Sequence, residues 1–133
     1  MKVSGILIDV SGKRGRVCET EVSEGNLKSF YKVLNCQTID ITQRSIGGKV
    51  FDIVCDDEGL LKENPRPSAL RKDGKIMLVG NLFVCNHYKE HLTSLSKEDV
   101  NFIMNNVGVV SYQTPTSEMF TSPILLNVNY PRM

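Results

Sequence analysis

The pattern of apolar and polar positions in the first 55 residues predicts two β-hairpins with a helix between them. Apolar residues recur at every second position on either side of a turn that contains Gly12 and Gly15, as expected for paired strands. The same alternation returns around the turn Gly47-Gly48. The predicted strands cover residues 3–10, 16–22, 37–43 and 49–55.

Two segments instead have apolar residues at the spacing of three and four that is typical of a helix packed on a core. The first covers residues 23–35, with Ser23 as a predicted N-cap and Asn35 as the predicted end. The second covers residues 96–107 and begins with Ser96 followed by an acid three positions later. The apolar stripes are Leu27, Phe30, Tyr31 and Leu34 in the first helix, and Val100, Ile103, Met104 and Val107 in the second.

The rest of the chain has weaker patterns. Residues 75–85 are apolar at nearly every position, which predicts a central strand broken or bulged at Gly80. Residues 56–74 have no clear period, although 68–72 are compatible with one helical turn. Residues 109–112 predict a short strand. The last apolar run, 124–128, lies in a segment rich in Thr, Pro and Ser.

These elements predict a single α+β domain at residues 1–113, followed by a tail at 114–133 that is either a docked strand or partly disordered. We expect a mainly antiparallel sheet of about five strands, with both helices packed on one face.

Composition narrows the class of protein. The formal net charge of +1 in 133 residues argues against a protein that binds nucleic acid through a broad basic surface. The four cysteines are widely spaced, which predicts reduced thiols in a cytosolic protein. The short apolar stretch near the N-terminus predicts neither a signal peptide nor a membrane span.

The acidic turn Asp56-Asp57-Glu58-Gly59 is the first candidate for chemistry. Clustered carboxylates can hold a divalent cation or form an acid–base pair, so one hypothesis is a small cation-dependent hydrolase or transferase. The simpler interpretation is a type I turn in which Asp begins the turn and Gly ends it. We favour the turn, and we assign no catalytic residue.

Cys85, His87 and His91 form a C-x-H-x-x-x-H pattern that resembles part of a zinc site. Structural zinc sites contain a second pair of ligands at short spacing, which this chain lacks. We therefore interpret both histidines as ordinary exposed residues, and we expect no metal and no cofactor.

The loop from Lys62 to Ser68 is the strongest candidate for recognition, because Pro65 and Pro67 restrict its conformations and fix the polar residues between and beside them. We expect Arg66 to act as an anion or carboxylate fork. The predicted binding surface consists of Asp56, Asp57, Glu58, Asn64, Arg66 and Asn81.

Several segments between Leu27 and Val107 carry a family resemblance: LKSFYKVLNC followed by TIDI, then DDEGLLKENPRPSAL, IMLVGNLFVC and LTSLSKEDV. In this order they resemble a domain-of-unknown-function family of small proteins carried mostly by phages, plasmids and Firmicutes. The family loop reads L-x-x-N-x-x-A, where Asn64 and Ala69 fill the corresponding places here beside two additional prolines. The resemblance implies a mobile-element accessory protein in a bacterial cytoplasm, and it implies no established reaction.

The leading hypothesis is therefore a non-enzymatic binding module for a host protein or a small ligand. The cation-dependent enzyme remains the alternative. A third hypothesis is a homodimer in which an exposed edge strand, or the tail at 122–130, pairs with a second copy.

Overall fold

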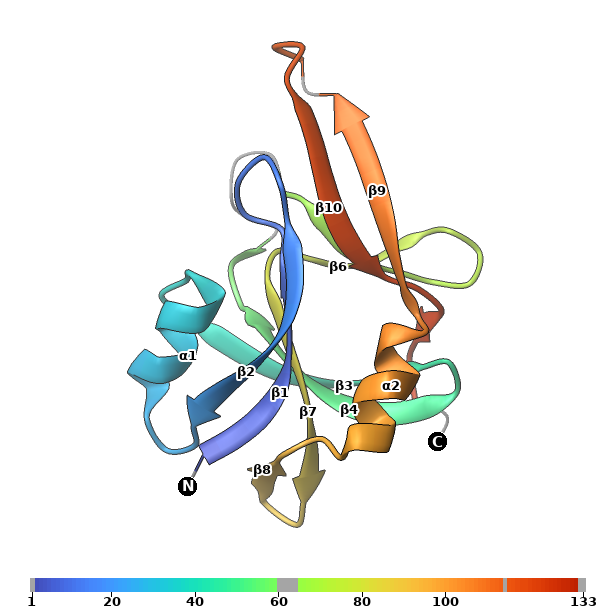
Figure 1. The fold of residues 1–133 in the computed structure, drawn as a ribbon. Coiled ribbons are helices and arrows are strands. Elements are labelled where there is room, and N and C mark those ends of the chain that lie inside the picture. The colour runs from blue at the N-terminus through green and yellow to red at the C-terminus, as the bar shows by residue number, and fades with distance from the viewer. Residues whose placement is uncertain (1, 60–64, 114, 132–133) are drawn as a thin grey trace.

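The computed structural model describes residues 2–59, 65–113 and 115–131, and in these residues the chain forms two helices and eleven strands (Figure 1). The helices are α1 (Leu27–Leu34) and α2 (Lys97–Met104). The strands are β1 (Lys2–Asp9), β2 (Arg16–Ser23), β3 (Ile39–Ile46), β4 (Lys49–Asp56), β5 (Pro67–Leu70), β6 (Ile76–Val79), β7 (Leu82–Tyr88), β8 (His91–Thr93), β9 (Val107–Gln113), β10 (Met119–Leu125) and β11 (Val128–Asn129). No helix of the described residues is long and apolar enough to cross a membrane.

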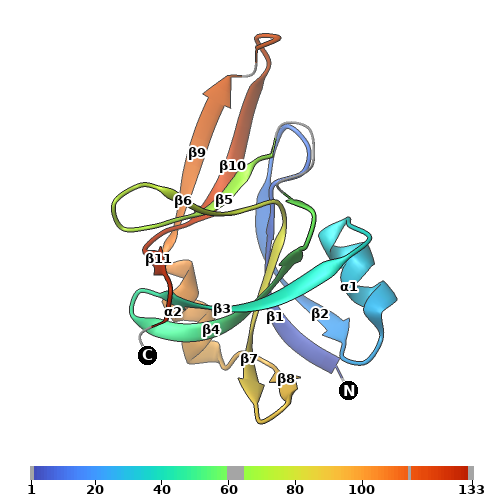
Figure 2. The same ribbon diagram turned by 180° about the vertical axis from the view of Figure 1, so that it is seen from behind.

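The strands are divided between two sheets. The larger has the order β11-β3-β4-β7-β1-β2, with β8 paired to β7, and the smaller has the order β6-β5-β10-β9 (Figure 2). Apart from the parallel contact of β5 with β10, the strand pairs named here are antiparallel. The predicted α+β class is confirmed, whereas the prediction of one sheet with about five strands is wrong.

The division between the sheets follows from Gly80. Its φ of +79° turns the chain between β6 and β7, so that the apolar run 75–85 supplies an outer strand to one sheet and a central strand to the other. The predicted break at Gly80 is confirmed, but the single central strand is not. The helical turn considered for 68–72 is also wrong, because Ser68 and Ala69 are buried in β5 between β6 and β10.

The two helices cover opposite faces of the larger sheet, so the prediction that both pack on one face is wrong. Phe30 and Leu34 of α1 pack in a cluster with Phe83, whereas Ile103 of α2 packs in the other cluster with Val84. Neighbouring residues of a strand point to opposite faces, and β4 and β7 are apolar at consecutive positions. Both faces of these strands therefore need a cover, and each helix provides one.

The helix boundaries show which polar groups cap them. Ser96 caps α2 as predicted, and its hydroxyl accepts a hydrogen bond from the Asp99 N–H at 3.1 Å. Asn35 ends α1 as predicted, in the left-handed conformation. Asn26 replaces Ser23 as the N-cap of α1, because Ser23 still belongs to β2.

The β1–β2 turn connects the two sheets. Thr121 of β10 accepts a hydrogen bond from the Gly15 N–H at 2.7 Å and donates one to the Lys13 carbonyl at 3.0 Å. The described residues after Gln113 thus contribute β10 to the smaller sheet and β11 to the larger one. The boundary predicted at residue 113 stays a prediction.

Candidate functional site

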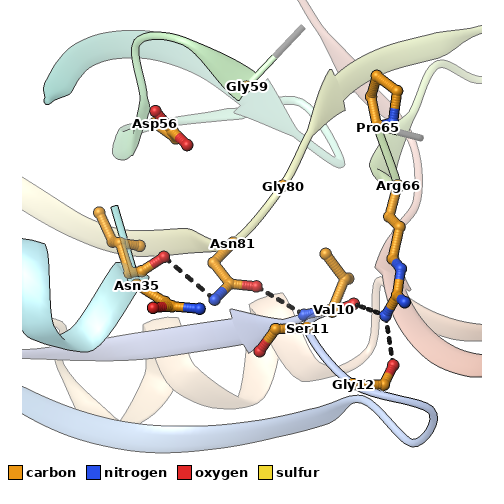
Figure 3. A pocket seen from close by; sticks show the side chains of 11 residues that line it. Val10, Ser11, Gly12, Asn35, Asp56, Gly59, Pro65, Arg66, Gly80 and Asn81 are labelled. Atoms are coloured by element: carbon orange, nitrogen blue, oxygen red, sulfur yellow. Dashed lines mark hydrogen bonds between the residues drawn. The ribbon is translucent and has the colours of Figure 1, made fainter. Parts of the chain in front are cut away.

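Three of the six predicted binding residues line one pocket of about 250 Å³ (Figure 3). The pocket lies where β1, α1 and β4 end, beside the turn at Gly80. Asp56, Arg66 and Asn81 contribute side chains to it, and Asn64 lies outside the described residues. The lining residues are Val10, Ser11, Gly12, Leu34, Asn35, Asp56, Gly59, Pro65, Arg66, Gly80 and Asn81.

Asn81 holds two walls of this pocket together. Its side chain is 6% exposed, and its amide oxygen accepts a hydrogen bond from the Val10 N–H at 2.8 Å. Its amide nitrogen donates to the Leu34 carbonyl at 3.2 Å, so one side chain joins the end of β1 to the end of α1 (Figure 3).

Arg66 holds the same segment after β1 from its carbonyl side. Its Nη1 donates to the Val10 carbonyl at 2.7 Å and also to the Gly12 carbonyl. Its guanidinium lies 4.0 Å from the centroid of the Phe120 ring, an attractive cation–π arrangement. Asn81 and Arg66 therefore preorganise the pocket by holding its backbone, whatever the pocket binds.

The acidic turn has the geometry of a local turn. The Asp56 carboxylate accepts a hydrogen bond from the Glu58 N–H at 2.9 Å, the pattern in which an aspartate closes the turn that it begins. Asp57 and Glu58 do not line the pocket of Figure 3; each lines a different hollow, and Asp56 also lines both of these. Among the described residues no three side chains of His, Cys, Asp or Glu are grouped closely enough to hold a metal ion.

A groove that the sequence did not predict lies on the α1 face of the larger sheet. This groove has a volume of about 660 Å³. Its lining includes apolar residues of α1 and β3 and both histidines of the chain. The groove is lined by Glu24, Gly25, Leu27, Phe30, Ile39, Ile41, Gln43, Asp52, His87, Lys89, Glu90, His91 and Leu92.

Each histidine of the groove is oriented by a carboxylate. The Nδ1 atom of His87 lies 2.9 Å from Oδ1 of Asp52, which is 6% exposed. The Nδ1 atom of His91 lies 3.0 Å from Oε1 of Glu24. The hydrogen bond to His91 lowers the pKa of Glu24 from its ordinary value, and Glu24 also accepts a hydrogen bond from the Leu92 N–H. Both imidazole rings are thus held in fixed orientations.

A buried thiol, that of Cys85, lies beside this arrangement. Cys85 is directly opposite Asp52 in the ladder of β4 and β7 and has no exposed surface. Burial raises the pKa of its thiol to about 12, and the charges of Asp52 and Glu24 add to the effect. The thiolate is the reactive form of cysteine, and the raised pKa disfavours that form at neutral pH.

The groove was not predicted because its partners are distant in sequence. His91 and Glu24 are 67 residues apart in the sequence, and only the folding of the chain brings them together. One signal was present: Asp52 interrupts the apolar strand 49–55, and a carboxylate in such a strand requires a polar partner.

The fold, the pocket and the groove define a small α+β protein with a preorganised pocket and a separate groove. Residues 1–108 match the family model of DUF3846, a domain of unknown function, and the chain belongs to this family. Membership confirms the resemblance to a domain of unknown function and names no reaction. No curated protein and no solved structure matches the chain significantly.

Proposed function

We propose that this protein is a non-enzymatic binding module, and that its groove binds an extended segment of a partner protein along the outer edge of β3. The observation that carries the proposal is the stretch of β3 beside the groove, whose outer edge pairs with no other strand of the described residues. Figure 2 shows β3 at the outer side of the larger sheet, with β11 next to its far end.

The main chain of β3 has hydrogen-bonding groups directed outward. β11 pairs with β3 only at Ser45 and Ile46, and Pro131, which has no N–H, follows two residues later. The Asp57 N–H donates to the Thr38 carbonyl at 3.3 Å. The pair Thr38–Asp57 is thus hydrogen-bonded. In an antiparallel ladder only every second residue is hydrogen-bonded to the neighbouring strand. Ile39 and Ile41 therefore direct their N–H and C=O groups away from β4.

The side chains of the same two residues line the groove. Ile41 is 49% exposed, and Leu27, which also lines the groove, is 55% exposed. A bound strand with apolar side chains at alternate positions would cover both while its main chain extends the sheet. Arg44 donates a hydrogen bond to the Gln43 carbonyl at 2.8 Å, and this carbonyl is the next one after Ile41 that faces outward. The segment that pairs with β3 is therefore short.

The biological setting rests on the family resemblance. We propose an accessory protein of a phage or plasmid, acting in the cytoplasm of its bacterial host on a host protein. Small accessory proteins of this kind need only a surface complementary to one partner, and the groove supports such a role.

A second candidate is a small polar ligand in the pocket of Figure 3. Its walls are fixed by Asn81 and Arg66, and a preorganised pocket loses little entropy when it binds. The cation-dependent enzyme has no such support, because Asp57 and Glu58 line different hollows.

Affinity capture from host lysate tests the proposed groove. We expect Ile41→Asp to reduce capture of the partner by about tenfold or more, since burial of an isoleucine side chain contributes roughly 1.5–3 kcal/mol. Ile76→Asp is the matched control, because Ile76 is also apolar and is 59% exposed on the smaller sheet. Identical proteins captured in equal amounts by the wild type and by both variants would contradict the proposal.

A further inference from the structure

We propose that β9 pairs with β9 of a second copy and forms an antiparallel homodimer. β9 is the outer strand of the smaller sheet. The β9–β10 hairpin extends away from the rest of the molecule (Figures 1 and 2), and among the described residues β10 is the only strand that pairs with β9. The segment 122–130, which was also considered for such pairing, is largely used by β10 and β11 within the chain itself.

The hydrogen bonds of the neighbouring strand define which groups of β9 point outward. The Leu126 N–H donates to the Asn106 carbonyl at 2.7 Å, so the pair 106–126 is hydrogen-bonded. Thr121, which faces Ser111, uses its own N–H and C=O on the turn at 13–15. Hydrogen-bonded and non-hydrogen-bonded pairs alternate along an antiparallel ladder. Every second residue of β9 therefore directs its main-chain N–H and C=O groups away from β10. These residues are Val107, Val109, Ser111 and Gln113.

Pro123 is consistent with this alternation. It lies opposite Val109 in β10, where the alternation directs the main-chain nitrogen away from β9. A proline is tolerated in a sheet at such a position because no ladder hydrogen bond is lost.

β9 lacks the features that usually protect an outer strand. It is seven residues long and contains no charged residue and no proline. Val109 is 71% exposed in its centre. By contrast, β2 at the edge of the larger sheet carries Glu19 and Glu21. An uncharged and exposed strand edge favours a further strand as its neighbour.

A second copy fits this edge because β9 is complementary to itself. In an antiparallel arrangement centred on Val110, Val109 faces Ser111 of the second copy and Val107 faces Gln113 of the second copy. All outward groups are then used, in about eight main-chain hydrogen bonds. Tyr112 lies opposite Gly108 of the second copy, where an aromatic ring can cover a glycine. No like charges meet, since the strand has none.

Light scattering after size exclusion, over a range of protein concentrations, tests this proposal. We expect the wild type to have twice the mass of the 14.9 kDa chain at high concentration. Val109→Pro removes an outward N–H and leaves the bonds to β10 intact, so we expect a monomer. Val109→Thr keeps the N–H and the β-branched shape, so we expect it to remain a dimer.

A double variant keeps the test decisive if Val109→Pro fails to fold. Val109→Lys with Ser111→Lys changes two exposed side chains and places like charges directly opposite each other across the interface. We expect this folded variant to be monomeric. A wild type that stays monomeric at the highest concentration would overturn the proposal, as would a dimer that survives in the double variant. Neither result bears on the groove, which lies on the other sheet.

Discussion

Replacing Gly5 with alanine is expected to lower the free energy of unfolding by about 3 kcal/mol or more. Gly5 lies in β1, beneath the ring of Phe83. An added Cβ would lie 2.6 Å from Cζ of Phe83 and still closer to the Val84 carbonyl oxygen. The ring cannot easily move, because its edge packs against Phe30 of α1 at a centroid distance of 6.2 Å. The added methyl group therefore has to displace β1 from β7.

Denaturant unfolding followed by circular dichroism measures this effect. Ser4→Ala, one residue earlier in β1, is the control, and we expect a much smaller change because its hydroxyl makes only an exposed contact with Glu21. Combining Gly5→Ala with Phe83→Leu should recover part of the loss, since the smaller side chain makes room for the new methyl group. A Gly5→Ala variant as stable as the wild type would show that β1 does not pack this closely on Phe83.

Asn81→Ala is expected to have the second largest effect, a loss of roughly 2–5 kcal/mol. The alanine removes the partners of the Val10 N–H and of the Leu34 carbonyl at once. Both hydrogen bonds are buried, and a buried polar group without a partner costs about 1–3 kcal/mol. The end of β1 would also lose its connection to α1, so the pocket of Figure 3 should open.

Thermal and denaturant unfolding provide the measurement for Asn81→Ala. Asn101→Ala is the matched control, because Asn101 is exposed on α2 and alanine is favourable in a helix. We expect the control to stay within about 0.5 kcal/mol of the wild type. If both variants were equally stable, Asn81 would not hold the walls of the pocket.

The sequence predicted the local elements well because their signals are local. Alternation identified both hairpins, and the capping signals at Ser96 and Asn35 placed one end of each helix. It did not predict the two sheets, because that outcome depends on one positive φ angle at Gly80. It also did not place the helices on opposite faces, since a strand that is apolar on both sides does not specify which helix covers which side.

The candidate sites were predicted only in part, and the reason is sequence distance. Asp56, Arg66 and Asn81 were grouped because they lie in one continuous stretch, and the structure brings them to one pocket. The groove joins Glu24 to His91 and Asp52 to His87 through pairings of distant strands. No motif spacing marks such pairs, and only the polar Asp52 within an apolar strand indicated that a partner was needed.

Amide hydrogen exchange of β3, measured by NMR with and without the captured partner, tests the central claim most directly. In the free protein the N–H groups of Asp40 and Thr42 are bonded to β4 and should exchange slowly, whereas those of Ile39 and Ile41 face outward and should exchange fast. The account predicts that Ile39 and Ile41 become as slow as their neighbours when the partner binds. Binding that leaves the exchange of Ile39 and Ile41 unchanged would contradict it.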